Sequence, residues 1–347
     1  MTAIKTALLS FGMSGEVFHG PLLRAHSGFD VTHILERTHQ RSLKQFPAAT
    51  IVRNIETIFN NNDIELIIVN TPNASHFDYA KAALEAGKHV VVEKPFSVTV
   101  EEADALIALA KVKGKVLTVF QNRRWDGDFL TVKKVVEGNL LGKIVEVETH
   151  YDRFRNYVEE GSWKEQRLEG TGILYNLGSH LLDQMIVLFG MPLSLDARMG
   201  IQRPQGQVDD YYDIRMQYKG FHTIIKSSYL VREQGPRYVL HGVEGSFVKY
   251  GIDPQEQALK DGLKPGSARW GHDEVSAWGK INTTTNGLHV EGKIETVAGD
   301  YLAFYENVYE AIRNGATLAV KPEESRDGIR LIEACFESNA QQRAVKL

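Results

Sequence analysis

Apolar residues follow two different periodicities in the two halves of the chain. In the first half, short apolar runs alternate with segments in which apolar residues recur at helical spacing. The predicted strands are Lys5–Phe11, Val31–Leu35, Thr50–Val52, Glu65–Asn70, Val90–Val92 and Val116–Phe120. The predicted helices are Glu16–His26 (disturbed by Pro21), one from Ile55, His76–Ala86, and one capped by Thr99 that ends at Lys113. This alternation predicts an α/β, doubly wound parallel sheet of the Rossmann type.

The second half has mostly the two-residue periodicity of half-exposed strands. Such segments are Lys143–Tyr151, Asp213–Tyr218, Thr223–Tyr229, Tyr238–His241 and Ser246–Tyr250, with helices at Phe129–Gly138, Tyr301–Arg313 and Glu323–Arg343. We expect an α+β domain with an open, mostly antiparallel sheet, one face of which is free for a partner subunit. Residues 251–297 look loop-rich, with weakly placed strands. The predicted domains are residues 1–122 and 123–347.

Composition excludes several classes of protein. The chain has 347 residues, 43% of them hydrophobic and 24% charged, and a net charge of -4. That charge argues against nucleic-acid binding, which needs a basic stripe. A single cysteine, Cys335, provides neither a disulfide nor a zinc cluster, so no metal site is predicted. The chain has no run of membrane-spanning length and no signal-peptide pattern at its start, so we expect a cytoplasmic protein.

A glycine-containing loop follows the first strand. It consists of Ser10, Phe11, Gly12, Met13, Ser14 and Gly15, and it approximates the dinucleotide fingerprint Gly-x-Gly-x-x-Gly, with Ser10 in place of the first glycine. Gly12 would let the backbone approach a pyrophosphate, and Gly15 would let the following helix pack on the strand. Two glycines in a loop are common, so the strand before and the helical segment after support this interpretation more than the glycines do.

The second strand ends at Glu36 and Arg37. Glu36 lies at the distance beyond the glycines at which an acidic residue binds the adenosine ribose, which favours NAD. Arg37 could instead meet a 2′-phosphate, so NADP stays open. The alternative is that Glu36 and Arg37 form a solvated charge pair at a turn and bind no ligand.

Polar residues also follow the other parallel strands, where open α/β sheets bind ligands. They are Thr71, Pro72, Asn73, His76, Glu93, Lys94 and Asn122. Pro95 ends the Val90–Val92 strand and holds Lys94 in an extended conformation. A surface pair of Glu93 with Lys94 is the simpler alternative.

One segment of the second half breaks the strand pattern. Gly170 and Gly172 form a turn that leads into a helix, and Asn176 and His180 share one face of it. Asp183, three residues after His180, could fix the tautomer of its ring. A core histidine bonded to a carboxylate is the alternative.

Three motifs together resemble the Gfo/Idh/MocA oxidoreductase family over the full length: Gly12-Met13-Ser14-Gly15, Glu93-Lys94-Pro95 and Asn176-Leu177-Gly178-Ser179-His180. Further segments, such as Asn122-Arg123-Arg124-Trp125-Asp126, are similar to its scyllo-inositol dehydrogenase branch. The resemblance implies NAD or NADP in the first domain and a polyol or sugar substrate between the domains. It also implies homodimers or tetramers through the open sheet, a cis peptide before Pro95, and contact of Glu93 with the nicotinamide ribose. Asn176 departs from the family, which commonly has aspartate there.

These residues suggest roles in oxidation of a secondary alcohol. Lys94 would stabilise the developing oxyanion, His180 would take the hydroxyl proton, and Asn176 would orient the substrate. Candidates for the pocket wall are Arg153, Arg155, Trp163 and Tyr175. Two alternatives stay open: a non-catalytic nucleotide-sensing regulator, and a nicotinamide-dependent glycoside hydrolase on the same fold.

Overall fold

The computed structural model describes residues 2–347, which form two compact units. The first unit contains residues 2–125, 254–271 and 300–326, and the second contains 126–253, 272–299 and 327–347. The single boundary at residue 122 stays a prediction. Tertiary contacts additionally assign two segments of the second half to the first unit.

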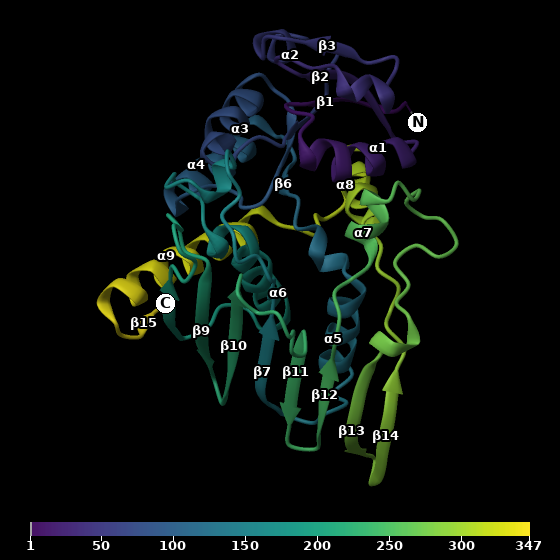
Figure 1. Ribbon diagram of the computed structural model, residues 1–347. Coiled ribbons are helices and arrows are strands. Elements are labelled where there is room, and N and C mark those ends of the chain that lie inside the picture. Colours follow the sequence, from purple (N-terminus) through teal and green to yellow (C-terminus); the bar gives the residue numbers. More distant parts are fainter. Residues whose placement is uncertain (1) are drawn as a thin grey trace. The chain divides into compact units, whose positions relative to one another are not determined.

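A six-stranded, fully parallel sheet forms the centre of the first unit (Figure 1). Its strands are β1 (Ile4–Leu8), β2 (Phe29–Leu35), β3 (Thr50–Val52), β4 (Leu66–Val69), β5 (His89–Val92) and β6 (Leu117–Val119). The order β3-β2-β1-β4-β5-β6 is that of a doubly wound dinucleotide-binding sheet, so the predicted fold class is confirmed. Strands β1 and β4 are neighbours at the point where the direction of winding reverses, which is where such sheets bind ligands.

The helices of this unit include four that begin within one residue of a predicted start (Ile55, His76, Thr99 and Tyr301) and several short ones that were not predicted. They are η1 (Ser14–His19), α1 (Gly20–Ala25), η2 (Arg41–Lys44), α2 (Glu56–Phe59), η3 (Asn73–Ser75), α3 (His76–Glu85), α4 (Val100–Lys113), η4 (Asn122–Trp125), α7 (Gln255–Lys260) and α8 (Leu302–Asn314). Thr99 and Glu102 form the capping box of α4. The single helix expected from Glu16 is instead a π-helical turn followed by α1, and Pro21 lies in the first turn of α1, where its missing N–H costs nothing.

The second unit contains a nine-stranded sheet in the order β14-β13-β12-β11-β7-β10-β9-β8-β15. Its strands are β7 (Ile144–His150), β8 (Ser194–Gly200), β9 (Tyr211–Tyr218), β10 (Phe221–Ser228), β11 (Tyr238–Gly242), β12 (Gly245–Lys249), β13 (Gly279–Thr285), β14 (Leu288–Ile294) and β15 (Val345–Lys346). Strands β7 and β10 run parallel, and the other paired neighbours are antiparallel, as the mostly antiparallel prediction requires. The hairpin of β13 and β14 occupies a segment that was predicted to be loop-rich with weakly placed strands.

Helices cover one face of this sheet. The other helical segments of the second half are α5 (Gly127–Glu137), η5 (Trp163–Glu165), η6 (Leu174–Gly178), α6 (Ser179–Phe189), η7 (Val275–Ala277) and α9 (Pro322–Gln341), and residues 322–326 of α9 belong to the first unit. Helices α5 and α6 lie behind the central strands in Figure 1. Val147 and Thr149 of β7 are fully buried, whereas the alternate residues of β7 are only half-buried. Cys335 of α9 is buried as predicted. Within residues 2–347, no helix is long and apolar enough to cross a membrane.

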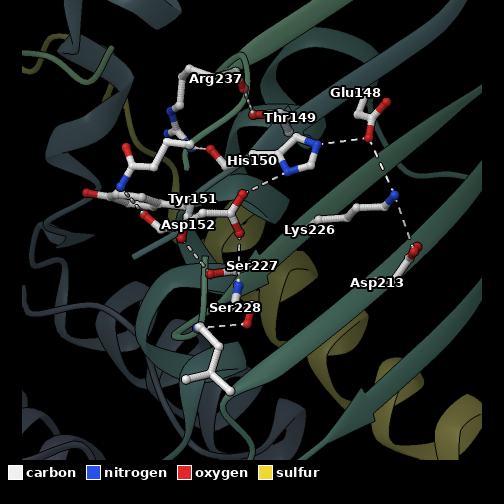
Figure 2. Close-up of polar contacts among 12 residues, drawn as sticks. Glu148, Thr149, His150, Tyr151, Asp152, Asp213, Lys226, Ser227, Ser228 and Arg237 are labelled. Atoms are coloured by element: carbon white, nitrogen blue, oxygen red, sulfur yellow. Dashed lines mark hydrogen bonds and ion pairs between the residues drawn. The ribbon is translucent and has the colours of Figure 1, made fainter. Parts of the chain in front are cut away.

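A row of charged groups crosses the half-buried face at β7, β10 and β9 (Figure 2). The ring nitrogens of His150 lie 3.0 Å from Asp152 Oδ2 and 2.8 Å from Glu148 Oε1. Lys226 Nζ in turn lies 3.5 Å from both Glu148 and Asp213. Burial lowers the pKa of His150, but its hydrogen bonds to Asp152 and Glu148 outweigh burial and raise the pKa above 6.5. The imidazolium form is therefore the one this face stabilises.

We predict that replacement of His150 by Gln destabilises the protein in a pH-dependent way. A raised pKa in the folded state contributes stability that is complete below pH 6.5 and is lost as the pH rises through the folded-state value. The gap in thermal midpoint between wild type and His150→Gln should therefore be largest near about pH 5.5 and smallest near about pH 8.5. His289→Gln, on the exposed strand β14, is the matched control. A gap that stays constant across this range would contradict the ionic role.

Candidate functional site

Reciprocal hydrogen bonds join the ends of β1 and β4. The Ser10 N–H donates to Asn70 Oδ1 at 3.0 Å, the Asn70 side-chain amide donates back to Ser10 O at 2.9 Å, and Ser10 Oγ donates to Asn70 O at 2.7 Å. Ser10 stands where the fingerprint has a glycine, and its hydroxyl supplies one of these bonds. The departure from the fingerprint therefore strengthens the join between the two strands at the winding reversal.

The two glycines of the loop have the environments that the fingerprint requires. A Cβ on Gly15 would lie 2.7 Å from Ser10 O, so only glycine allows η1 to pack this closely on β1. A Cβ on Gly12 would project into open space, with nothing within 4 Å. The space over Gly12 is the room that a pyrophosphate would need, so this loop fits a dinucleotide.

A cavity of about 600 Å³ lies beside this loop, within the first unit. Six predicted cofactor residues line it: Phe11, Gly12, Glu36, Arg37, Thr71 and Pro72. Six further polar or small residues also line it and were not predicted: Thr38, His39, Arg41, Ala74, Ser75 and Tyr79. The first three follow β2 directly, so their place at a strand's carboxyl end was a usable signal. Tyr79 lies a turn into α3, where the sequence gives no such signal.

Glu36 is buried, and its carboxylate holds the loop that follows β2. The Arg41 N–H donates to Oε2 and the Ser42 N–H donates to Oε1, each at 2.8 Å. From the other side, Arg53 Nη1 donates to the backbone oxygens of Glu36 and His39. Residues 37–41 are exposed above these anchors. The loop at the cavity rim is thus fixed from below while its side chains face outward.

Glu93 sits at the carboxyl end of β5 in a network of its own. His19 Nε2 lies 3.1 Å from Oε1, and the Lys94 N–H donates to Oε2 at 3.0 Å. The other ring nitrogen of His19 lies 2.6 Å from Tyr305 Oη. Burial alone would raise the pKa of Glu93, but the hydrogen bond from His19 and the charges of His19, Lys94 and His76 lower it to about 2. Glu93 is therefore a fixed carboxylate beside Lys94.

His76 ties two loops together beneath the surface. Its ring is fully buried, with Nδ1 at 2.8 Å from Pro95 O and Nε2 at 2.9 Å from Thr71 O. The Lys94-Pro95 peptide bond is cis, as the family resemblance implied. His76 thus supports the loops that carry Thr71 and Lys94, without lining the cavity. Met13, Ser14, Asn73 and Asn122 do not line it either; Asn73 begins η3 and Asn122 is buried at the start of η4.

In the second unit, Asp209 anchors the turn that carries Asn176. Its backbone oxygen accepts the Ile173 N–H at 2.8 Å, and its Oδ2 accepts the Leu174 N–H at 2.9 Å. Gly172 has φ +95°, and a Cβ there would lie 2.0 Å from Asp209 Oδ1. Burial raises the pKa of Asp209 to about 6, although the backbone hydrogen bond from Leu174 opposes it. The sequence showed the glycines of this turn but not their partner, because Asp209 is over thirty residues away.

Asn176 and His180 lie one turn apart across the η6–α6 junction. The Asn176 side-chain amide donates to Tyr229 Oη at 3.2 Å. His180 and Asp183 are both largely buried on α6. Lys94 belongs to the first unit and this pair to the second, so the structure assigns the proposed catalytic groups to separate units.

The four predicted pocket-wall residues have different environments. The Arg153 guanidinium lies 5.3 Å from the Tyr151 ring centre, and the Arg155 guanidinium lies 5.8 Å from that of Tyr229. Arg155 and Asn176 therefore both contact Tyr229, the first at its ring and the second at its hydroxyl. Tyr175 is largely buried and packs against Phe336 of α9, so its ring belongs to the core of the second unit.

Trp163 lies on η5, and a buried arginine supports that segment. Arg203 pairs with Glu165 of η5 at 2.7 Å and with Asp210 at 2.9 Å, and it also donates to Tyr157 O. Sequence reasoning did not single out Arg203. Among residues 2–347, no cluster of histidine, cysteine and acidic side chains is arranged to hold a metal ion.

Family models match both parts of the chain. Residues 4–121 match the oxidoreductase family's NAD-binding Rossmann fold, and residues 133–347 match its C-terminal alpha/beta domain. The chain belongs to the Gfo/Idh/MocA oxidoreductase family, and the predicted recognition and enzyme class are confirmed.

Several relatives span almost the whole chain. It is 41% identical over 344 residues to scyllo-inositol 2-dehydrogenase (NADP(+)) IolW of Bacillus subtilis, covering 99% of this chain and 96% of IolW. It is 40% identical to the uncharacterized oxidoreductase YdgJ of Escherichia coli, covering 98% and 97%. Among solved structures, the Bacillus subtilis oxidoreductase YvaA superposes with a TM-score of 0.96 at 40% identity, covering 100% and 99% of the two chains. A Bacteroides fragilis oxidoreductase superposes with a TM-score of 0.91 at 44% identity, covering 99% and 100%.

The low pKa of Glu93 leads to a prediction about stability. Because the pKa is about 2 in the folded protein and 4.5 in the unfolded chain, ionised Glu93 stabilises the fold above about pH 4.5 and loses that contribution as the pH falls toward 2. Glu93→Gln should lower the thermal midpoint at about pH 6, and its difference from wild type should shrink by about pH 3. Glu101→Gln, exposed on α4, is the control. If the difference in thermal midpoint between wild type and Glu93→Gln is as large at about pH 3 as at about pH 6, the substitution acts through packing and not through the charge of Glu93.

Proposed function

We propose that this protein is a nicotinamide-dependent dehydrogenase or reductase that interconverts a secondary hydroxyl and a carbonyl on a cyclic, inositol-like polyol or sugar. The observation that carries the proposal is the placement of Glu93 and Lys94. Glu93 and Lys94 are the first two residues after the buried strand β5, and His19 fixes the Glu93 carboxylate, in the unit with the Gly12 loop and its cavity.

The residues of the first unit fit a nicotinamide dinucleotide. The space over Gly12 would take the pyrophosphate, and the cavity between Gly12, Arg37 and Thr71 would take the adenosine end. Thr71, Pro72 and Asn73 would contact the dinucleotide along the carboxyl end of β4, and Glu93 would bind the nicotinamide ribose. The nicotinamide ring supplies the hydride acceptor or donor.

The chain's own residues provide the acid–base chemistry. The Lys94 ammonium stabilises the oxygen as negative charge develops on it, and donates a hydrogen bond to a carbonyl in the reverse direction. His180 takes the hydroxyl proton, a task that suits an imidazole near neutral pH. Asn176, an amide, cannot accept that proton; held by Tyr229, it orients a substrate hydroxyl. Arg153, Arg155 and Trp163 are proposed to contact the remaining hydroxyls.

The relative IolW supports the substrate class, because its name states scyllo-inositol as substrate and NADP as cofactor. Glu36 and the match to an NAD-binding Rossmann fold support NAD instead, so both cofactors belong to the proposal. Family resemblance further supports assembly into homodimers or tetramers through the open face of the nine-stranded sheet. A cytoplasmic location also stays a proposal.

We predict turnover of scyllo- or myo-inositol in a panel of inositols and aldoses, each tested with NAD and NADP. The readout is the near-ultraviolet absorbance of the reduced nicotinamide. If the panel is silent while the nucleotide binds, the polyol assignment is wrong. Release of product from a glycoside without net change in the cofactor would then indicate the glycoside hydrolase, and binding without either reaction would indicate the regulator.

We predict that Lys94→Met binds the nucleotide with unchanged affinity and lowers kcat by about 10²–10³-fold, as loss of one oxyanion donor does. Nucleotide affinity is measured by calorimetry and kcat by absorbance. Lys111→Met, on the exposed face of α4, is the matched control and should keep wild-type kcat. Wild-type turnover by Lys94→Met would rule out the assigned role.

A further inference from the structure

We infer that Arg203 is a positioning residue for the substrate: its buried guanidinium fixes Tyr229, and through Tyr229 it sets the direction of the Asn176 side-chain amide. The same guanidinium pairs with Glu165 of η5, the turn that carries Trp163. The inference rests on the proposed function, in which Asn176 orients a substrate hydroxyl. It adds to the proposed site a residue that acts only through its neighbours.

Two carboxylates and one backbone oxygen hold the Arg203 guanidinium. Its Nε donates to Asp210 Oδ2 at 2.9 Å, its two terminal nitrogens donate to the Glu165 oxygens at 3.1 and 2.7 Å, and Nη1 also donates to Tyr157 O at 2.7 Å. The Arg203 side chain is 0% exposed, so water does not compete for these bonds. A guanidinium that pairs with one carboxylate through two bonds and with a second through a third has little freedom to rotate. Its orientation within the second unit is therefore fixed.

This guanidinium lies over the ring of Tyr229. The Arg203 guanidinium carbon is 4.7 Å from the ring centre, which is within the range of a cation–π contact. The Tyr229 N–H donates to Asp210 O at 3.1 Å, so Arg203 and its ion-pair partner together hold the ring and the backbone of Tyr229. Tyr229 Oη accepts the Asn176 side-chain amide at 3.2 Å. A shift of Arg203 would therefore reach Asn176 through a single aromatic ring.

The energetics of this ion cluster indicate that it determines geometry more than stability. Removing a guanidinium and two carboxylates from water costs about as much as their attraction returns, so a buried cluster adds little over well-packed apolar side chains. A guanidinium differs from a lysine ammonium in its rigid plane and its fork of N–H donors. Only the planar group can pair with Glu165 through two parallel bonds while it stacks on Tyr229. We therefore expect lysine at position 203 to keep the charge and lose the alignment.

The first test is the substitution Arg203→Lys. We expect it to lower kcat/KM for the polyol by about 10–10²-fold, as a small misplacement of an orienting group does, while KM for the nucleotide stays within about twofold. Wild-type kcat/KM for the polyol would overturn the inference.

The matched control is the reverse exchange, Lys249→Arg. Lys249 is the second unit's other example of a cation buried to 1% exposure, and its ammonium donates to Asp273 at 2.7 Å and to the backbone oxygens of Tyr250 and Ala277. Because none of these partners belongs to the proposed substrate site, Lys249→Arg should lower the thermal midpoint and leave kcat/KM within about twofold of wild type.

A double-mutant cycle separates the route through Tyr229 from a general loosening of the fold. Tyr229→Phe keeps the ring and removes only the hydroxyl that holds Asn176. If Arg203 acts through that hydroxyl, the double variant Arg203→Lys with Tyr229→Phe should lose no more than about twofold in kcat/KM beyond the more damaged single variant. Losses that multiply would show that Arg203 acts independently of the hydroxyl, and would overturn the inference.

The side-chain amide signal of Asn176 tests the same route without turnover. In NMR spectra of full-length protein labelled with ¹⁵N-asparagine, this signal is the one that Asn176→Asp removes. We expect Arg203→Lys and Tyr229→Phe each to move the signal, and Lys249→Arg to leave it in place. An unchanged signal in Arg203→Lys would overturn the inference, whereas a moved signal in a protein that oxidises no polyol would count against the proposed function alone.

Discussion

The candidate nucleotide site depends on the reciprocal hydrogen bonds between Ser10 and Asn70. They join β1 and β4 at the reversal of winding, which is the place where an open parallel sheet leaves room for a ligand. Gly15 must pack against Ser10 O for η1 to begin there, and the Gly12 backbone faces the resulting space. A clamp that uses both main chain and side chain keeps this space open, because neither strand can slide without breaking all three bonds.

Those parts of the fold that depend on local pattern could be predicted from the sequence. Val90–Val92 is fully buried in β5, and the Thr99 capping box begins α4, which ends before Gly114 as expected. Each of these patterns lies within a short stretch of sequence, so no knowledge of tertiary contacts is needed to recognise it. Strand β8 escaped prediction because Ser194–Gly200 contains no β-branched residue and gains its place by pairing with β9. Residues 251–297 were expected to hold only weakly placed strands, and the bounds of the β13–β14 hairpin were not predicted although both strands contain β-branched residues.

In the candidate site, too, some residues could be predicted from local sequence pattern, and others depend on tertiary contacts. Residue type and position at a strand end indicated Gly12, Arg37 and Thr71, and all three line the cavity. The role of Glu36 could not be read this way, because spacing places its backbone but not its hydrogen-bond partners. Asp209 and His19 were likewise invisible: each acts on a motif from a distant part of the chain, through contacts that only the fold creates. The sequence pattern indicated residues that line the cavity, and tertiary hydrogen bonds determine which side chains remain available to a ligand.

The Glu36 carboxylate also limits how this loop can evolve. Its two oxygens hold the N–H groups of Arg41 and Ser42, so the number of residues between the anchor and its partners is fixed. An insertion or deletion there would break both bonds, whereas residues 37–40 are exposed and can be exchanged with little effect on the fold. Divergence in this loop should therefore occur by substitution at constant length, which lets ligand preference drift while the scaffold is conserved.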